Sequence, residues 1–171
     1  MTVARPHWRP AYVGVGSNLD DPPRQVRNAF DALGRIPDTQ LVRVSSLYRS
    51  APMDGSAQPD YINAVAALLT QLEATAFFRA LQAIEIQQGR KRPAKRWAAR
   101  PLDLDLLVFG EQEICNDDLT VPHAGIAERR FVLKPLCEIA PQLRVPGHGL
   151  VQGMLDDLPA GAAVELLENT T

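Results

Sequence analysis

The sequence lacks the long apolar segments that place a protein in a membrane. No uninterrupted apolar run approaches the roughly 18 residues that indicate a spanning helix. The N-terminal stretch MTVARPHWRPAYVG also has no apolar core of the kind that secretory signal peptides carry. Cysteine is scarce: the two present, Cys115 and Cys137, have no metal-ligand spacing and make no disulfide framework. These absences predict a protein without a membrane segment, in a reducing, cytoplasmic setting.

A strong excess of one charge is missing as well. The chain has 18 Lys and Arg against 20 Asp and Glu, a net charge of −2 and a pI near 5.9. Dedicated nucleic-acid-binding domains are usually strongly basic, so this balance argues against a nucleic-acid partner. The two common glycine-rich nucleotide loops are absent too. GxxxxGK[ST] occurs nowhere, and GVGSNL at 14–19 lacks the third glycine of a dinucleotide fingerprint.

Positive charge is instead concentrated in one stretch, GRKRPAKRWAARPLDLDLLVFG at 89–110. Its first half carries six basic residues in eleven positions and no acid. Its second half alternates leucine with aspartate and predicts a strand over 102–109, with the leucines on one face and Asp103 and Asp105 on the other. Two residues of strand separate the aspartates by about 7 Å at their backbones, close enough to hold one divalent ion or a pair.

A cationic loop beside paired carboxylates suits a metal–polyphosphate substrate. The aspartates would hold Mg²⁺, the metal would meet phosphate oxygens, and guanidinium groups would neutralise the remaining charge. Structural explanations compete with this interpretation, because a basic run is often a solvated face and acids on an edge strand discourage aggregation. A ferredoxin-like RNA-binding module with Trp97 as a stacking platform is a further alternative. Against that alternative, the adjacent aspartates would repel phosphate in the absence of metal.

The coarse order of the expected elements is βαββαβ. The patterns predict strands over 12–15, 40–48, 61–69 and 102–109, helices over 22–33, 74–88, 127–133 and 150–158, and a hairpin over 110–116. This order indicates an α/β (α+β) fold with a ferredoxin-like core, extra C-terminal helices and long loops at 50–60 and 90–101 that can act as lids. We expect a flexible N-terminal extension over 1–10, one domain over 11–160 and a C-terminal tail over 161–171.

Six ordered motifs between Tyr12 and Pro141 resemble one known family. They are GSNL at 16–19, SSLYRSAP at 45–52, QPDYINA at 58–64, IEIQQGR at 84–90, RWAARPLDLDLLVFG at 96–110 and LTVPH at 119–123. On these motifs the chain resembles the 6-hydroxymethyl-7,8-dihydropterin pyrophosphokinase family of folate biosynthesis, and RW-x-x-R-x-LDLD is the most specific of them. The resemblance implies transfer of the diphosphate of ATP to the hydroxymethyl group of the dihydropterin, with release of AMP. It also implies two Mg²⁺ ions at Asp103 and Asp105.

The resemblance assigns residues to each role. The catalytic residues would be Arg90, Arg92, Asp103 and Asp105, the two arginines lying on a mobile loop that closes over the phosphates. The residues expected at the pterin are Ser50, Ala51, Pro52, Met53, Tyr61, Asn63, Trp97, Asp103 and Phe131, with the ring stacked between Trp97 and Phe131. The residues expected at ATP are Gln82, Glu85, Arg92, Trp97, Arg100, Leu106, Thr120, His123 and Arg129. No general base is assigned.

Asn63 is the residue whose role changes with this resemblance. It stands in a run of small and aliphatic residues, and the pattern alone leaves two interpretations open, a satisfied core amide or a group that reads a ligand. The family match favours the second interpretation, because a flat heteroaromatic ring with an amide-like edge calls for an amide donor and acceptor.

Four positions depart from the family pattern. Asp118 stands where relatives often carry an arginine near the triphosphate, and Ala124 replaces an aromatic residue beside His123. Pro93 and Pro101 stiffen the catalytic loop and its exit. The departures at Asp118 and Ala124 leave open a nucleotide sensor without catalysis on the same scaffold. We expect a monomer whose partners are the pterin and ATP, with no nucleic acid and no membrane.

Overall fold

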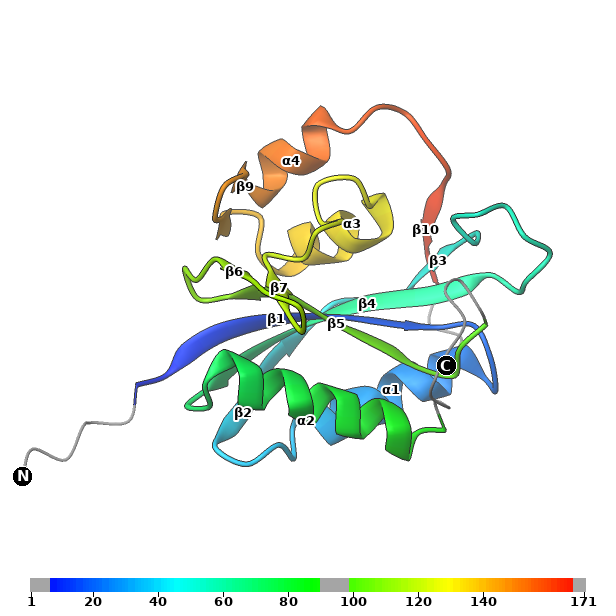
Figure 1. Cartoon of the computed structure of the whole chain (residues 1–171). Helices are drawn as coiled ribbons and strands as arrows, with labels where there is room; N and C mark the ends of the chain where they lie inside the picture. The colour runs from blue at the N-terminus through cyan, green and yellow to red at the C-terminus, as the bar shows by residue number, and fades with distance from the viewer. Residues whose placement is uncertain (1–6, 90–98, 168–171) are drawn as a thin grey trace, which may run out of the picture.

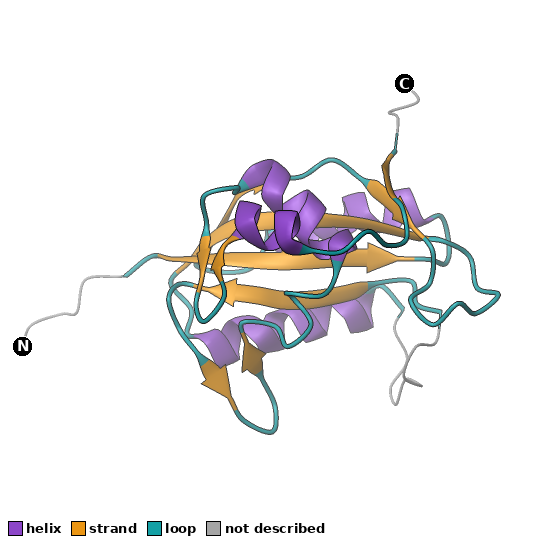
Figure 2. Ribbon diagram, turned by 90° about the horizontal axis from the view of Figure 1, so that it is seen from above, coloured by secondary structure: helices purple, strands orange, loops and turns teal. Residues whose placement is uncertain are grey.

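The chain folds around one antiparallel sheet that has helices on both faces (Figure 1). The computed structural model describes residues 7–89 and 99–167. Helices α1 (Pro22–Leu33) and α2 (Ala74–Gln87) cover one face, while α3 (Arg130–Ile139) and α4 (Val151–Asp157) lie over the other. Seen from above, helices overlie strands that run side by side (Figure 2).

The sheet confirms the predicted ferredoxin-like topology. Its strands are β1 (Arg9–Ser17), β2 (Thr39–Val44), β3 (Tyr48–Ser50), β4 (Tyr61–Thr70), β5 (Asp103–Phe109) and β10 (Val164–Leu166). The hydrogen-bonded order is β10-β3-β4-β1-β5, β2 also pairs with β4, and every pairing is antiparallel. Each of the crossovers through α1 and α2 therefore skips one neighbouring strand, as a split βαβ unit requires.

Alternating side chains divide the apolar residues between two cores. Leu102, Leu104 and Leu106 lie on the face covered by α1 and α2, with Phe77 and Leu81 of α2. The core on the other face is formed mainly by β5, α3 and α4, and its buried members are Val65, Leu107, Val108, Ile126, Val132, Leu133, Leu136, Val145, Val151 and Met154. Burial of the strand leucines on one face leaves Asp103 and Asp105 on the face of α3, as the alternation predicts.

The strand expected over 40–48 is broken in the structure. β2 and β3 lie end to end along the same edge of β4, with registers that reach Ala66 and Asn63 respectively. The break falls at Ser45, whose N–H donates to the Val65 carbonyl at 2.8 Å while its Oγ accepts the Val65 N–H at 2.9 Å. A serine side chain thus replaces a backbone partner, which ends regular pairing and redirects the chain.

A hairpin and a helix in the second half of the chain lie at other residues than the sequence predicts. The hairpin expected over 110–116 is instead formed by β6 (Ile114–Cys115) with β7 (Thr120–Val121). The helix expected over 127–133 runs from Arg130 to Ile139 and continues through Pro135, a residue that usually ends helices. Val132, Leu133 and Leu136 of this helix are buried. The burial of their apolar side chains stabilises the helix although the proline removes one backbone hydrogen bond.

Both ends of the expected domain extend further than predicted. Arg9 and Pro10, placed in the N-terminal extension by sequence, already pair with Thr70 and Leu69 of β4. Residues 164–166, placed in the C-terminal tail, form β10 and pair with β3. The helix expected over 150–158 is α4, and β8 (Arg144–Val145) pairs with β9 (Gly149–Leu150) just before it. No helix within residues 7–89 and 99–167 combines the length and apolar character needed to cross a membrane.

Candidate active site

A row of residues across three strands forms the floor of the candidate site. Gly16 of β1 pairs with Asn63 of β4 on one side and with Asp103 of β5 on the other. Gly14, two residues earlier, pairs with Val65 and Asp105 in the same way. Because glycine has no side chain, the sheet is open between the Asn63 amide and the Asp103 carboxylate. A Cβ placed on Gly16 would lie 3.4 Å from Asn63 Oδ1, so this opening depends on the glycine.

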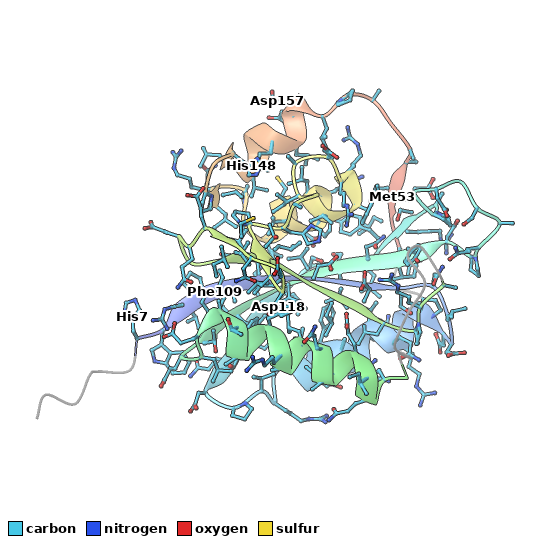
Figure 3. All side chains as sticks on the ribbon, viewed as in Figure 1. His7, Met53, Phe109, Asp118, His148 and Asp157 are labelled. Carbon is cyan, nitrogen blue, oxygen red and sulfur yellow. The ribbon has the colours of Figure 1, made fainter. Side chains whose placement is uncertain are left out.

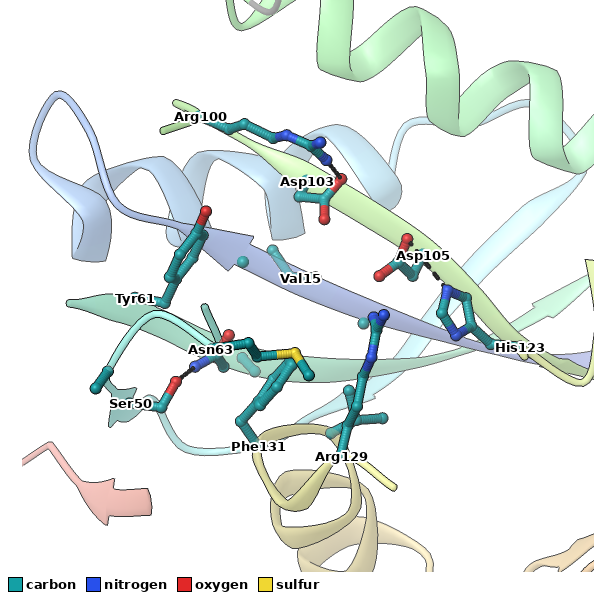
Figure 4. Close-up of a pocket in the computed structure, with 16 residues that line it drawn as sticks. Val15, Ser50, Tyr61, Asn63, Arg100, Asp103, Asp105, His123, Arg129 and Phe131 are labelled. Carbon is teal, nitrogen blue, oxygen red and sulfur yellow. Dashed lines mark hydrogen bonds and ion pairs between the residues drawn. The ribbon is translucent and has the colours of Figure 1, made fainter. Parts of the chain in front are cut away.

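The two aspartates lie together above this floor (Figure 4). Asp103 Oδ1 accepts a hydrogen bond from Arg100 Nη1 at 3.1 Å, and Asp105 Oδ1 lies 3.7 Å from His123 Nε2. Arg100 is held in turn by Asn18, which follows β1: the Arg100 N–H donates to Asn18 Oδ1 at 2.8 Å and its carbonyl accepts the Asn18 N–H at 3.1 Å. The carboxylates thus face Arg100 and His123, and Arg100 is held by its two hydrogen bonds with Asn18.

The floor belongs to a pocket of about 250 Å³ beneath the start of α3. The rings of Tyr61 and Phe131 line it, and Asn63 donates from Nδ2 to Ser50 Oγ at 2.7 Å (Figure 4). The full lining is Gly14, Val15, Gly16, Ser50, Ala51, Met53, Tyr61, Asn63, Ala64, Arg100, Asp103, Asp105, His123, Arg129, Phe131 and Val132. Aromatic walls with a few fixed polar groups are typical of a site for a flat, polar-edged small molecule.

A second pocket, of about 240 Å³, adjoins the first at Asp105 and His123. It is lined by Phe78, Asp105, Leu106, Asp118, Leu119, Thr120, His123 and Ala124. Asp105 and His123 line both pockets and so mark their junction. Met53, in the first pocket, and Asp118, in the second, lie well apart in the molecule (Figure 3). Two ligands bound in these pockets would meet at Asp105 and His123.

The surroundings change the protonation of this junction. Withdrawal from water, reinforced by the Asp103 charge, raises the pKa of Asp105 to about 7, although Arg129 and Arg100 oppose the rise. Burial and the neighbouring Arg129 lower the pKa of His123, so the imidazole is neutral at pH 7. His123 Nδ1 accepts the Gly125 N–H at 3.1 Å, which leaves the proton on Nε2, the nitrogen that faces Asp105. Asp105 has a raised pKa because its charged form is disfavoured by burial and beside Asp103, and a bound cation would stabilise that charged form.

A divalent ion held here would need ligands from outside the protein as well. No group of three or more His, Cys, Asp or Glu side chains able to hold a metal occurs within residues 7–89 and 99–167. Mg²⁺ is commonly bound by only one or two carboxylates together with substrate phosphates and water. The Asp103–Asp105 pair matches that donor set, since both side chains line the pocket.

Most of the sequence-predicted residues in the described ranges converge on the two pockets. The first pocket contains Ser50, Ala51, Met53, Tyr61, Asn63, Arg100, Asp103, Asp105, His123, Arg129 and Phe131, and the second contains Leu106 and Thr120. Pro52, Gln82 and Glu85 line neither pocket. Arg90, Arg92 and Trp97 lie outside the described residues.

Glu85 has a structural contact that its sequence assignment did not foresee. Its side chain is buried, and Oε1 accepts the Leu104 N–H at 2.8 Å. β5 is the last strand of the sheet, so that backbone group has no strand partner on its outer side. A buried carboxylate on α2 thereby fixes the strand segment that carries the two aspartates.

Several residues of the site were missed by sequence reasoning. Gly14, Gly16, Ala64, Val132 and Phe78 line the pockets without carrying functional groups. The Gly-Val-Gly-Ser-Asn run gave a signal, because two glycines at i and i+2 of a strand clear one face. Strand order was needed to use that signal, since only the pairing of β1 with β5 places the glycines opposite the aspartates.

Comparison with known proteins gives a consistent set of relatives. Residues 12–141 match the family model of 7,8-dihydro-6-hydroxymethylpterin-pyrophosphokinase. A 2-amino-4-hydroxy-6-hydroxymethyldihydropteridine pyrophosphokinase of Pseudomonas aeruginosa is 50% identical over 135 residues, which cover 79% of this chain and 83% of that protein. The Haemophilus influenzae protein of the same name is 43% identical over 141 residues, 82% of this chain and 88% of its own length.

Solved structures are similar in fold. A crystal structure of Plasmodium falciparum HPPK-DHPS matches with a TM-score of 0.68 over 90% of this chain, at 10% sequence identity. The matched region is 43% of that protein, so this chain spans less than half of its length. At such low identity the likeness concerns the fold alone, and it agrees with the ferredoxin-like topology described above.

Proposed function

The chain belongs to the 7,8-dihydro-6-hydroxymethylpterin-pyrophosphokinase family, and from this premise we propose that its two adjoining pockets bind the two substrates of that reaction. The enzyme is an ATP-dependent pyrophosphokinase of folate biosynthesis. It transfers the diphosphate of ATP to the hydroxymethyl group of 6-hydroxymethyl-7,8-dihydropterin and releases AMP. The observation that carries the proposed arrangement is the position of Asp105 and His123, which line both pockets.

The first pocket is proposed to bind the pterin. The ring would lie over Gly16, where the sheet has no side chain, with Tyr61 and Phe131 as aromatic walls. Asn63 would read the edge of the ring. Since its Nδ2 already donates to Ser50 Oγ, its Oδ1, which faces the opening above Gly16, is the atom available to accept from the pterin. In this position the hydroxymethyl group can point across Gly16 toward Asp103, which pairs with that glycine.

The second pocket is proposed to bind the nucleotide. Phe78, Leu106 and Leu119 offer apolar surface to the base, with Thr120 on the same wall. The triphosphate would then extend past His123 toward Arg100 and Arg129. These are the arginines that line the first pocket within residues 7–89 and 99–167. Arg90 and Arg92 are proposed to add charge from the 90–98 segment, and Trp97 to contact the substrates; these residues lie outside the described ranges. Gln82 and Glu85 are proposed to support this pocket from α2.

Asp103 and Asp105 are proposed to hold two Mg²⁺ ions together with the phosphates. Bound there, the ions would neutralise charge on the phosphate oxygens and orient the diphosphate for in-line attack. The protein's own contribution is electrostatic and positional. Arg100 and Arg129 balance the aspartates, and the neutral His123 presents its Nε2 hydrogen at the junction. No side chain is assigned as a general base.

The activity is tested by measuring AMP release from ATP and Mg²⁺ with and without 6-hydroxymethyl-7,8-dihydropterin. AMP that depends on the pterin, together with a pterin heavier by a diphosphate in mass analysis, is the expected result. Nucleotide binding without AMP release would contradict the proposed activity and would favour a nucleotide sensor. Asp118 and Ala124, which line the nucleotide pocket, are the residues on which that alternative rests.

We also propose that the protein acts as a cytoplasmic monomer without a nucleic-acid or membrane partner. Both pockets are assembled from one chain, so the described site does not require a second copy. Cys115 and Cys137 are free thiols, which suits a reducing compartment. Sedimentation at working concentration tests the first point, because a stable dimer would contradict it.

A further inference from the structure

A polar cluster on α3 joins this helix to the sheet edge behind the pterin pocket. Glu138 accepts the Ser46 N–H at 3.1 and 3.0 Å on its two oxygens, the Ser46 hydroxyl at 2.7 Å, and the Tyr48 hydroxyl at 2.7 Å. One carboxylate therefore holds the chain at the junction of β2 and β3. Hydrogen bonds to a charged acceptor are among the stronger ones in proteins.

Lys134, one helical turn before Glu138, holds a third element in the same cluster. Its Nζ lies 5.8 Å from the centroid of the Tyr48 ring and donates to the Val164 carbonyl of β10 at 2.7 Å. Val164 is paired with Ser50, and Leu166 with Tyr48. The cluster of Tyr48, Lys134 and Glu138 thus joins α3, β3 and β10.

Helical and strand periodicity connect this cluster to the pocket. Phe131, Lys134 and Glu138 are spaced by three and four residues, so they follow one face of α3, and Phe131 is a wall of the pocket. Tyr48 and Ser50 share one face of β3; Tyr48 pairs with Asn63, and Ser50 accepts the Asn63 hydrogen bond. One end of each element holds the cluster, and the other end forms the pocket.

Tyr48 is the buried member of this connection. Tyr48 is 6% exposed, and its burial, with the hydrogen bond and charge of Glu138, raises the pKa of its hydroxyl well above the ordinary value. The hydroxyl therefore remains a donor at all working pH values. Glu138 is exposed, so what stabilises α3 against β3 is the set of hydrogen bonds that its carboxylate accepts from Ser46 and Tyr48, together with the packing of the buried Tyr48 side chain.

We propose that Tyr48, Lys134 and Glu138 are positioning residues for the pterin pocket, because they fix the Phe131 wall of α3 relative to the Ser50–Asn63 pair on the sheet. This inference rests on the proposed assignment of the first pocket to the pterin. The nucleotide pocket is lined by residues of α2, β5 and the 118–124 segment, and none of the three cluster residues is among them. Loosening the cluster should therefore act on one substrate and not on the other.

The test compares Tyr48→Phe, Lys134→Met and Glu138→Gln with Glu165→Gln, a matched loss of charge at an exposed position of β10. Pterin fluorescence gives the Kd for the pterin directly, and steady-state kinetics gives KM for each substrate. We expect the pterin Kd and KM to rise about three- to thirtyfold in the three variants, in line with couplings carried by packed networks. The KM for ATP, and all constants of the control, should stay at the wild-type value.

Tyr48→Phe is the decisive variant because it retains the ring beneath Lys134 and removes only the hydroxyl. A lower Tm with unchanged pterin Kd would overturn the inference and leave the cluster with a purely structural role. Equal increases in both KM values would overturn it as well. Failure of the wild-type enzyme to bind the pterin would overturn the assignment of the pocket itself, so the two failures are distinguishable.

Discussion

The pterin pocket and the nucleotide pocket are built from different kinds of structure. The first is formed largely by paired strands and the start of α3, and two polar contacts are already made within it, Asn63–Ser50 and Arg100–Asp103. The second takes most of its lining from residues 118–124 around β7, with Phe78 from α2 and Asp105 and Leu106 from β5. Asp118, Thr120 and Ala124 in that segment are exposed. The rigid pocket should discriminate among ligands strongly, whereas the exposed one should tolerate change.

Asp105, which lines both pockets, should give the largest effect. We expect Asp105→Asn to lower kcat by on the order of 10³-fold or more. The amide that replaces the carboxylate has no negative charge at the junction of the two pockets. Steady-state AMP release measures the loss. Retention of normal activity would contradict the mechanism, because it would mean that the Asp105 carboxylate is not needed for the reaction.

The same variant should remain folded. A folded-state pKa of about 7, above the ordinary value of 3.8, means that the folded protein binds more protons than the unfolded chain between those values. Stability contributed by this group is therefore lost as pH rises through 7. Replacing Asp105 by Asn removes that loss, so thermal melting without Mg²⁺ at pH 8 should show a Tm at or above the wild-type value. A clear fall in Tm would contradict a raised pKa of Asp105 in the folded protein.

Local patterns were sufficient to predict the chemistry of β5 but not the walls of the pockets. Alternation of leucine and aspartate placed Asp103 and Asp105 on one face, and the structure confirms it because the leucines are buried against α1 and α2. The site residues were assigned through family motifs, and Glu85 shows the limit of that route: its contact with the Leu104 N–H depends on β5 being an edge strand. Likewise, the role of Gly16 follows from strand order. Pairings between distant segments cannot be read from local periodicity.

Gly16 tests whether the pterin pocket is as rigid as its pairing suggests. We expect Gly16→Ala to weaken pterin binding about tenfold, since the new Cβ, in ordinary contact 3.4 Å from Asn63 Oδ1, would occupy the space over Gly16 proposed for the ring. The KM for ATP should not change. Gly153→Ala, in α4 where an added Cβ meets open space, is the matched control. An unchanged pterin Kd would show that the pterin pocket adapts to the added methyl group and is not rigid.

Metal binding at the junction should depend on pH. Since the pKa of Asp105 is about 7 in the metal-free protein, protons compete with Mg²⁺ below that pH. The apparent Mg²⁺ affinity should fall by up to about tenfold for each pH unit below 7 and level off above pH 8. Calorimetric titration measures how the Mg²⁺ affinity depends on pH. A range from roughly pH 5.5 to pH 8.5 extends to both sides of this pKa. Asp105→Asn should bind the ion weakly with a much flatter profile, and an equally steep profile in that variant would assign the proton to another group.

Asp118 should give the smallest effect, because it lies in the exposed wall of the nucleotide pocket. Removing its negative charge with Asp118→Asn should lower the KM for ATP about two- to threefold at low ionic strength, since like charge near a polyphosphate is screened by water and salt. The change should disappear as salt is raised, and the pterin Kd should not move. Asp117→Asn, an equally exposed neighbour that does not line the pocket, is the control. A large, salt-independent change in Asp118→Asn would mean that this wall closes around the nucleotide, and the contrast between a rigid and an adaptable pocket would then be wrong.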